Sequence, residues 1–108
     1  MQYNKLVRDR IPAIVTNAGQ TAVTRVMDDF EYRQALLIKL VEEVGEFTKE
    51  RSLDELADIL EVVYALAEAE GASKEELEFR RAEKARSRGG FAERVFLIET
   101  KEKKSTSW

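Results

Sequence analysis

The chain contains no cysteine and no histidine, and each absence excludes a class of chemistry. Without cysteine there is neither a disulfide framework nor a thiolate metal site, which fits a reducing compartment. Without histidine there is no imidazole-bound zinc, no Ser/His/Asp triad and no histidine general base. Carboxylates are therefore left for acid–base chemistry, and a metal ion would have to be bound by oxygen.

Long apolar runs are also missing. The longest, around residues 59–67, is interrupted by Glu61 and Tyr64, and nothing resembles a signal peptide. We therefore expect a soluble, cytoplasmic protein with no membrane partner. A net charge of -3 argues against general nucleic-acid binding. With 108 residues, 44% of them apolar, the chain is expected to form one domain over residues 1–108.

Helical signals dominate the chain after a basic arm at residues 1–11. Pro12, the single proline, suits the first turn of a short helix that Gly19 would end. Capping boxes predict the starts of three longer helices, at Asp28 with Glu31, at Ser52 with Glu55 and at Ser73 with Glu76. The first of these is expected to run to about residue 51, the second to end at Gly71 and the third to run into residues 87–90.

Two segments show strand patterns instead. Residues 21–27 alternate and carry β-branched side chains, and residues 91–99 form a second apolar run. We expect these two segments to pair, and residues 100–108 to form a polar tail that frays. The predicted fold class is mainly α, an antiparallel helical bundle with a small two-stranded β element.

Four acids flank the apolar stripes of the two central helices. At 100° per residue, Glu43 lies at the edge of the first stripe and Glu46 about 60° beyond it; Glu55 and Asp58 repeat this arrangement in the next helix. The first stripe consists of Leu36, Leu37, Leu40, Val44 and Phe47. The short connection predicts an antiparallel hairpin. Glu46 and Glu55 are equally far from its middle, as are Glu43 and Asp58, so the four carboxylates should meet as two facing pairs.

Such a cluster requires a positive partner. At about 5 Å and an effective dielectric near 20, each pair of carboxylates repels by roughly 3 kcal/mol. Oxygen ligands at this density suit Mg²⁺, with Mn²⁺ as a possible substitute. Two simpler readings stay open: Glu55 completes a capping box with Ser52, and Glu43 pairs with Lys39 four residues earlier.

The second central helix is apolar almost all round. Its polar surface is a narrow arc made by Asp54, Glu61 and Glu68. A chain of this size has little left to cover such a helix, so we predict a homo-oligomer, a dimer or a tetramer. The alternative is a helix buried wholly within one chain.

The acidic motifs resemble those of a known family. The sequence "EEVGE" at residues 42–46, followed by "ELAD" at residues 55–58, is similar to the EExxE and ExxD motifs of the all-α nucleoside triphosphate pyrophosphohydrolases, the MazG-like group. The segments "YNKLVRDRIPAIV" and "RGGFAERVFLIE" resemble its phosphoribosyl-ATP pyrophosphohydrolase-like branch. The connection between the motifs is shorter than is usual in MazG itself.

The resemblance implies a Mg²⁺-dependent hydrolase that cleaves a nucleoside triphosphate between its α- and β-phosphates, giving a monophosphate and pyrophosphate. Glu43, Glu46, Glu55 and Asp58 would hold the metal, with Glu42 or Glu46 as the catalytic base. Cations that would bind the phosphates are Lys5, Arg8 and Arg10 in the arm and Lys84 and Arg88 before the glycine pair. For these cations a solvated arm and a favourable charge at a helix C-terminus remain alternatives.

Three functions follow as hypotheses. The first is a house-cleaning enzyme that removes unwanted nucleotides from the pool. The second is hydrolysis of phosphoribosyl-ATP, and the third is a noncatalytic helical interaction module. Magnesium-dependent release of pyrophosphate distinguishes the enzymes from the module.

Overall fold

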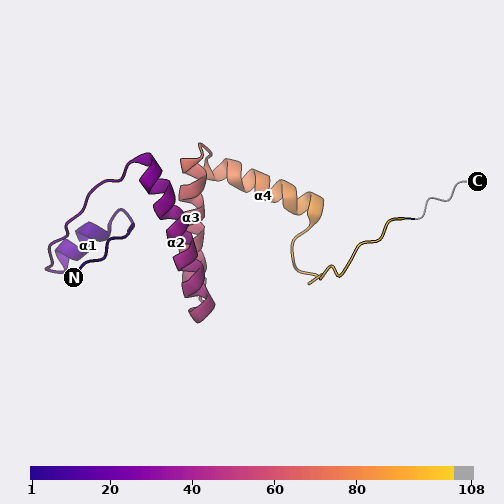
Figure 1. Ribbon diagram of the computed structural model, residues 1–108, viewed down its shortest axis with the longest axis horizontal. Helices are drawn as coiled ribbons and strands as arrows, with labels where there is room; N and C mark the ends of the chain where they lie inside the picture. Colours follow the sequence, from indigo (N-terminus) through magenta and orange to yellow (C-terminus); the bar gives the residue numbers. More distant parts are fainter. Residues whose placement is uncertain (104–108) are drawn as a thin grey trace, which may run out of the picture.

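The protein is mainly α-helical. A computed structural model describes residues 1–103, which contain four helices and no strand. The helices are α1 (Ile11–Asn17), α2 (Asp29–Glu50), α3 (Leu53–Ala69) and α4 (Lys74–Arg88). Figure 1 shows α2 and α3 side by side at the centre, with α1 on one side of them and α4 on the other.

Local side-chain caps set the helix starts where the sequence predicts them. Each capping side chain accepts a hydrogen bond from the backbone N–H three residues later, which satisfies a donor that the first helical turn leaves unpaired. These bonds join Asp28 to Glu31 at 2.8 Å, Ser52 to Glu55 at 3.2 Å and Ser73 to Glu76 at 3.1 Å. The prediction of three capped helices is confirmed.

The connection between α2 and α3 consists of Arg51 and Ser52 only. Arg51 has a left-handed backbone, with φ of 49°, and its N–H donates to the carbonyl oxygen of Phe47 at 2.8 Å. Such a short connection turns α3 back along α2. At the other end of the hairpin, Arg33 Nη2 donates to the carbonyl oxygen of Ala69 at 2.6 Å. The hairpin is therefore held at both ends.

The seam between α2 and α3 differs from the predicted one. Leu36 and Val62 are buried in it, and so is Glu43, which is only 9% exposed. Leu37 and Val44, predicted to belong to the core stripe, are about half exposed. Within one chain part of the predicted core stripe is therefore exposed, because a helix with a single neighbour covers only part of a wide stripe.

Helix α4 does not close a bundle around this hairpin. Among the described helices, α2 packs on α3 and α3 packs on α4, and α4 makes no comparable contact with α2. Gly71, with φ of 86°, redirects the chain between α3 and α4. Figure 1 shows α4 leaving one end of the hairpin at a large angle, so that the described chain extends over 81 × 32 × 22 Å.

The predicted β element does not form within one chain. Residues 21–27 and 94–99 have no regular secondary structure, and residues 91–93 form a bend and a turn, so neither segment contains a strand. Figure 1 shows why they do not pair: the hairpin and α4 lie between them, and they occupy opposite parts of the molecule. In the predicted polar tail, residues 100–103 have no regular structure, and residues 104–108 lie outside the described residues.

Few apolar side chains of the described chain are buried. Leu36 and Val62 form the whole buried apolar core within residues 1–103. Large apolar side chains are exposed on α2, on α3 and throughout residues 91–98. In the same part of the chain, no helix combines the length and the apolarity needed to cross a membrane.

Candidate metal centre

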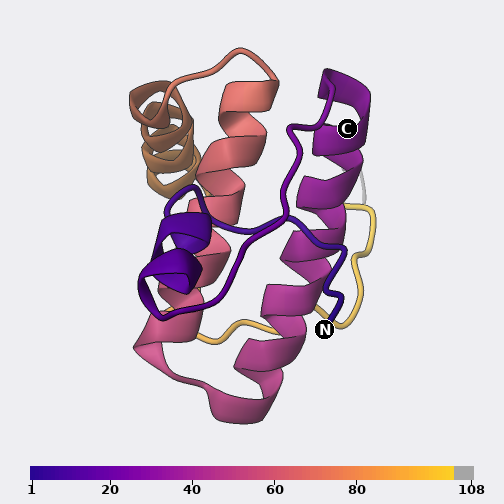
Figure 2. The same ribbon diagram turned by 90° about the vertical axis from the view of Figure 1, so that its left-hand side faces the viewer.

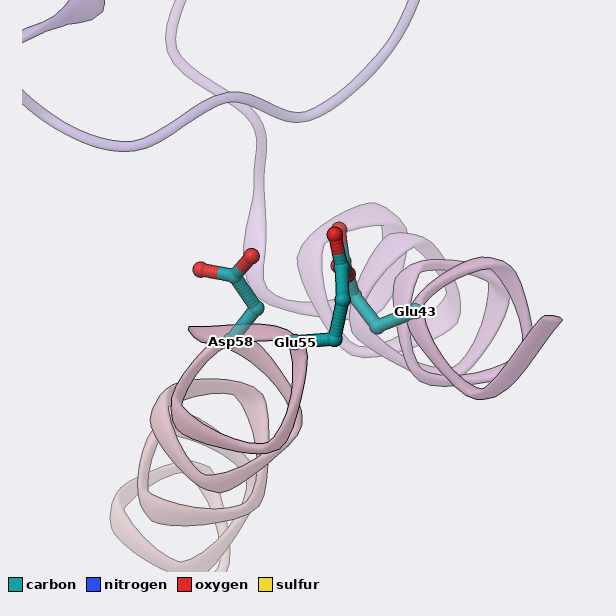
Figure 3. A group of neighbouring side chains, drawn as sticks. All are labelled: Glu43, Glu55 and Asp58. Carbon is teal, nitrogen blue, oxygen red and sulfur yellow. The ribbon is translucent and has the colours of Figure 1, made fainter. Parts of the chain in front are cut away.

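Three carboxylates meet on one side of the hairpin. Glu43 comes from α2, whereas Glu55 and Asp58 come from the first two turns of α3 and share a face because they are three residues apart. One oxygen of each residue lies within 4.8 Å of the other two. Figure 3 shows all three side chains pointing to the same side of the helix pair. The tight turn at Arg51 and Ser52 thus brings residues 12 and 15 positions apart in the chain into one cluster.

Glu55 is the least satisfied member of the cluster. Its Oε2 atom is buried and has no hydrogen-bond partner. Desolvation raises the pKa of Glu55, and the negative charges of Asp58 and Glu43 raise that pKa further, with smaller contributions from Glu50 and Glu46. A buried carboxylate oxygen without a partner is unfavourable unless a proton or a cation satisfies it.

Two cations compensate the other two carboxylates. Lys39 Nζ lies 3.5 Å from Glu43 Oε1 and 3.6 Å from Glu42 Oε1. Arg8 Nη2 donates to Asp58 Oδ1 at 2.6 Å and connects the N-terminal arm to the hairpin. The pairing of Lys39 with Glu43, considered above as an alternative to a metal site, coexists with the cluster. The direct contact of Arg8 with Asp58 had no signal in the sequence beyond the charge of the arm.

The structure places the two remaining predicted acids differently. Glu46 is half-buried and close enough to raise the pKa of Glu55, but it lies outside the group of three whose oxygens are mutually within 4.8 Å. Glu42 is exposed and faces Lys39. Glu55 also takes part in the predicted cap through its backbone N–H, while its side chain points into the cluster. The side chain of Glu55 thus does not complete the predicted capping box with Ser52, and its role as a metal ligand stays a prediction.

The predicted phosphate-binding cations are spread over the molecule. In the arm, Lys5 Nζ lies 5.8 Å from the centroid of the Tyr3 ring, and Arg10 is the exposed residue that precedes α1. Lys84 and Arg88 are exposed on α4. Figure 2 shows the arm passing in front of the hairpin with α4 behind, so α4 lies on the other side of the hairpin from the arm. Of the five cations, Arg8 is the one paired with a carboxylate of the cluster.

The donor set fits a small divalent cation. The three candidate ligands are carboxylate oxygens, which Mg²⁺ and Mn²⁺ prefer. The buried Oε2 atom of Glu55 provides a lone pair with no other partner, and Glu43 provides a second carboxylate from a buried position.

Comparison with known proteins adds one relative. A protein of Mycolicibacterium smegmatis, described only as uncharacterized, is 52% identical to this chain over 42 residues. The matched segment covers 39% of this chain and 43% of that protein, so the match spans less than half of the relative. No protein-family model matches the chain, and no solved structure matches it.

Proposed function

We propose that the protein is a Mg²⁺-dependent nucleoside triphosphate pyrophosphohydrolase of the MazG-like group. It would hydrolyse the bond between the α- and β-phosphates and release a nucleoside monophosphate and pyrophosphate. The observation that supports this proposal most is the cluster of Glu43, Glu55 and Asp58, in which a buried oxygen of Glu55 has no partner. The order of the acidic motifs and their flanking segments, which resemble this family, supports it independently.

In this proposal Glu43, Glu55 and Asp58 bind the magnesium ion, with Glu46 as a further ligand close by. When bound, the ion would neutralise phosphate charge. It would also lower the pKa of a water molecule, so that the water loses its proton more easily and can attack at neutral pH. The carboxylates would also fix the position of the triphosphate by holding the ion between the two helices. Positioning of this kind accounts for a large part of the rate enhancement in phosphoryl transfer.

The proton of the attacking water needs an acceptor. Water forms a bond to the α-phosphorus, the bond from that phosphorus to the bridging oxygen breaks, and pyrophosphate leaves with the electron pair. We assign the acceptor role to Glu46, because it is half-buried beside Glu55. Glu42 is the alternative, but it is exposed and faces Lys39.

The triphosphate also requires cations. Arg8 would exchange its bond to Asp58 for a bond to a phosphate oxygen, because a magnesium ion compensates Asp58 in its place. Lys5 and Arg10, in the same arm, would add further phosphate contacts. Lys84 and Arg88 lie on α4, away from this cluster, so the proposed site of a single chain does not include them.

The biological role that fits this chemistry is house-cleaning of the nucleotide pool in the cytoplasm. The proposal includes a homo-oligomer, a dimer or a tetramer, because a core of two buried apolar side chains is too small for a chain of this length. Phosphoribosyl-ATP is the competing substrate, because the flanking segments resemble that branch of the family.

The test is a magnesium titration with a panel of nucleoside triphosphates and phosphoribosyl-ATP. Monophosphate and pyrophosphate are the expected products, with kcat/KM highest for one of the triphosphates. Formation of diphosphate and phosphate would contradict the proposed bond cleavage. Absence of magnesium-dependent hydrolysis with every substrate would leave the noncatalytic module.

A matched pair of variants tests the site itself. Glu43→Gln keeps the shape of the side chain but removes a buried ligand charge, so we expect kcat to fall by roughly 100- to 1000-fold, the usual effect of losing one group that stabilises transition-state charge. Glu61→Gln is the control, because Glu61 is exposed on α3 outside the cluster. Equal activity of both variants would contradict the assignment of the site.

A further inference from the structure

One face of the hairpin is apolar and bare. On α2 the exposed apolar side chains other than Ile38 lie about 100° to 160° around the helix from Glu43, and on α3 they lie at about the same angles from Glu55. They are Phe30, Leu37, Val41 and Val44 on α2 and Leu53, Leu56 and Leu60 on α3. Because the acids of both helices share one side, these two stripes together form a bare face on the other side.

A second apolar surface lies at the end of the described chain. Phe91, Val95, Phe96, Leu97 and Ile98 are between 73% and 97% exposed. Residues 94–100 have no regular secondary structure. The run of four consecutive apolar residues at 95–98 is typical of a segment that is covered on both sides. We refer to residues 91–99 as the strap.

The two surfaces are held apart within one chain. The strap follows α4, which at 1.5 Å per residue is about 22 Å long and leads away from the end of the hairpin. Figure 1 shows the strap beyond α4, on the side of the hairpin away from α1. The radius of gyration is 20.6 Å, whereas a compact domain of about 100 residues has a value of about 13 Å.

We propose that the strap of one copy packs along the bare face of the α2–α3 hairpin of a second copy, so that two copies exchange their C-terminal segments. The extended shape of a single chain is then the shape of one member of an exchanged pair. The apolar surfaces that each chain leaves exposed are covered by the corresponding surfaces of its partner.

The size of the strap is sufficient for a stable interface. Two phenylalanine side chains bury about 300 to 500 Å² together. A stable interface requires about 800 Å² on each partner. Alternate side chains of an extended strap point to opposite sides, so only some of its apolar side chains face the helices. Exchange also buries the apolar side chains of each partner's own bare face, so both surfaces contribute to the area on each partner, and a symmetric pair has two equivalent contacts.

The first measurement is the mass of the full chain by sedimentation equilibrium. We expect a dimer of twice 12.4 kDa. Phe96→Asp and Val41→Asp place a charge in the two halves of the contact and should each weaken the dimer at least about 30-fold. Glu93→Gln, on the strap but polar, is the control and should leave the dimer intact. A wild-type monomer, or a dimer that tolerates both aspartates, would overturn the proposal.

Covalent cross-linking distinguishes a strap that packs on the hairpin of a second copy from a strap that packs on the hairpin of its own chain. The chain has no cysteine, so Val41→Cys and Ile98→Cys introduce unique thiols. Treatment of the double variant with a flexible bismaleimide should link two chains, and a mixture of the single variants should give linked pairs. A link within one chain, or no link between positions 41 and 98, would overturn the proposal. Val41→Cys with Arg80→Cys, on the exposed surface of α4, is the control. Mass and linkage are read without substrate, so the result is independent of the proposed hydrolysis.

Discussion

The two faces of the α2–α3 hairpin differ in what covers them. On one face the arm approaches, and Arg8 bonds to Asp58 beside the cluster of acids. On the opposite face, large apolar side chains such as Leu37, Val41 and Leu60 are exposed. Polar groups are crowded where the chain covers itself, and apolar groups are bare where it does not.

This difference separates two requirements of the protein. The acidic face needs a proton or a cation, because Glu55 has a buried oxygen without a partner. The apolar face needs a surface that the same chain does not bring to it, because hydrophobic stabilisation comes only from area removed from water. The site would thus be assembled by one hairpin, whereas the stability of that hairpin depends on a second contact.

The largest expected effect compares two neighbouring leucines. Leu36 is 3% exposed in the seam, whereas Leu37 is 49% exposed on the bare face. Leu36→Ala should lower the free energy of unfolding by about 2 to 5 kcal/mol, because it leaves a cavity in the seam. Leu37→Ala should cost less and should mainly weaken self-association. Urea unfolding at two protein concentrations measures both effects, and equal, concentration-independent losses would contradict the distinction between the faces.

An intermediate effect concerns the arm on the acidic face. Arg8→Ala should raise KM for the triphosphate about 10-fold with little change in kcat, because one charge-assisted contact to phosphate is lost. It should also tighten Mg²⁺ binding without substrate, since Arg8 no longer competes for Asp58. Calorimetric titration with Mg²⁺ measures the second effect.

Arg10→Ala is the control for the Arg8 variant, because Arg10 is exposed in the same arm. If Arg8→Ala leaves both KM and Mg²⁺ affinity unchanged, the bond between Arg8 and Asp58 is an ordinary surface ion pair.

The smallest expected effect concerns the stability of the metal-free protein. Because the folded state raises the pKa of Glu55, it binds this proton more tightly than the unfolded state does. The contribution of Glu55 to the stability of the folded state is therefore fully present at low pH, and it is lost as the pH rises through the raised pKa of Glu55. Glu55→Gln has no such loss, so in EDTA its melting temperature should exceed that of the wild type at pH 7.

The same two proteins should melt alike at about pH 3, below the ordinary pKa of a glutamate, where Glu55 is protonated in both states. Addition of Mg²⁺ at pH 7 should stabilise the wild type and not the variant, because the ligand is lost. A Glu55→Gln variant that is less stable at both pH values would indicate that the carboxylate is structural.

Much of the helical structure could be predicted from the sequence, because its signals are local. A cap joins residues three apart, such as Ser52 and Glu55, and it forms wherever the backbone turns into a helix. The approach of Glu43 to Asp58 could also be predicted, since a short connection leaves two helices one way to lie together. The group of three acids is therefore a feature of the hairpin alone.

Contacts between distant segments could not be predicted in this way. The pairing of residues 21–27 with residues 91–99 was wrong for one chain, because strand propensity says nothing about how α4 places a segment. For the same reason the sequence did not show that Lys84 and Arg88 would lie away from the acids.

The sequence by itself determined where the helices begin, where the hairpin turns and that this turn brings acids of α2 and α3 together, but not that Glu46 lies outside the group of three. These features depend on hydrogen bonds and spacings within a few residues or across one short connection. The tertiary structure alone decided that Glu43 and Leu36 are buried while Leu37 is exposed, and that Arg8 reaches Asp58. Those outcomes depend on which part of a wide apolar stripe meets its neighbour, which is set by the packing of whole helices.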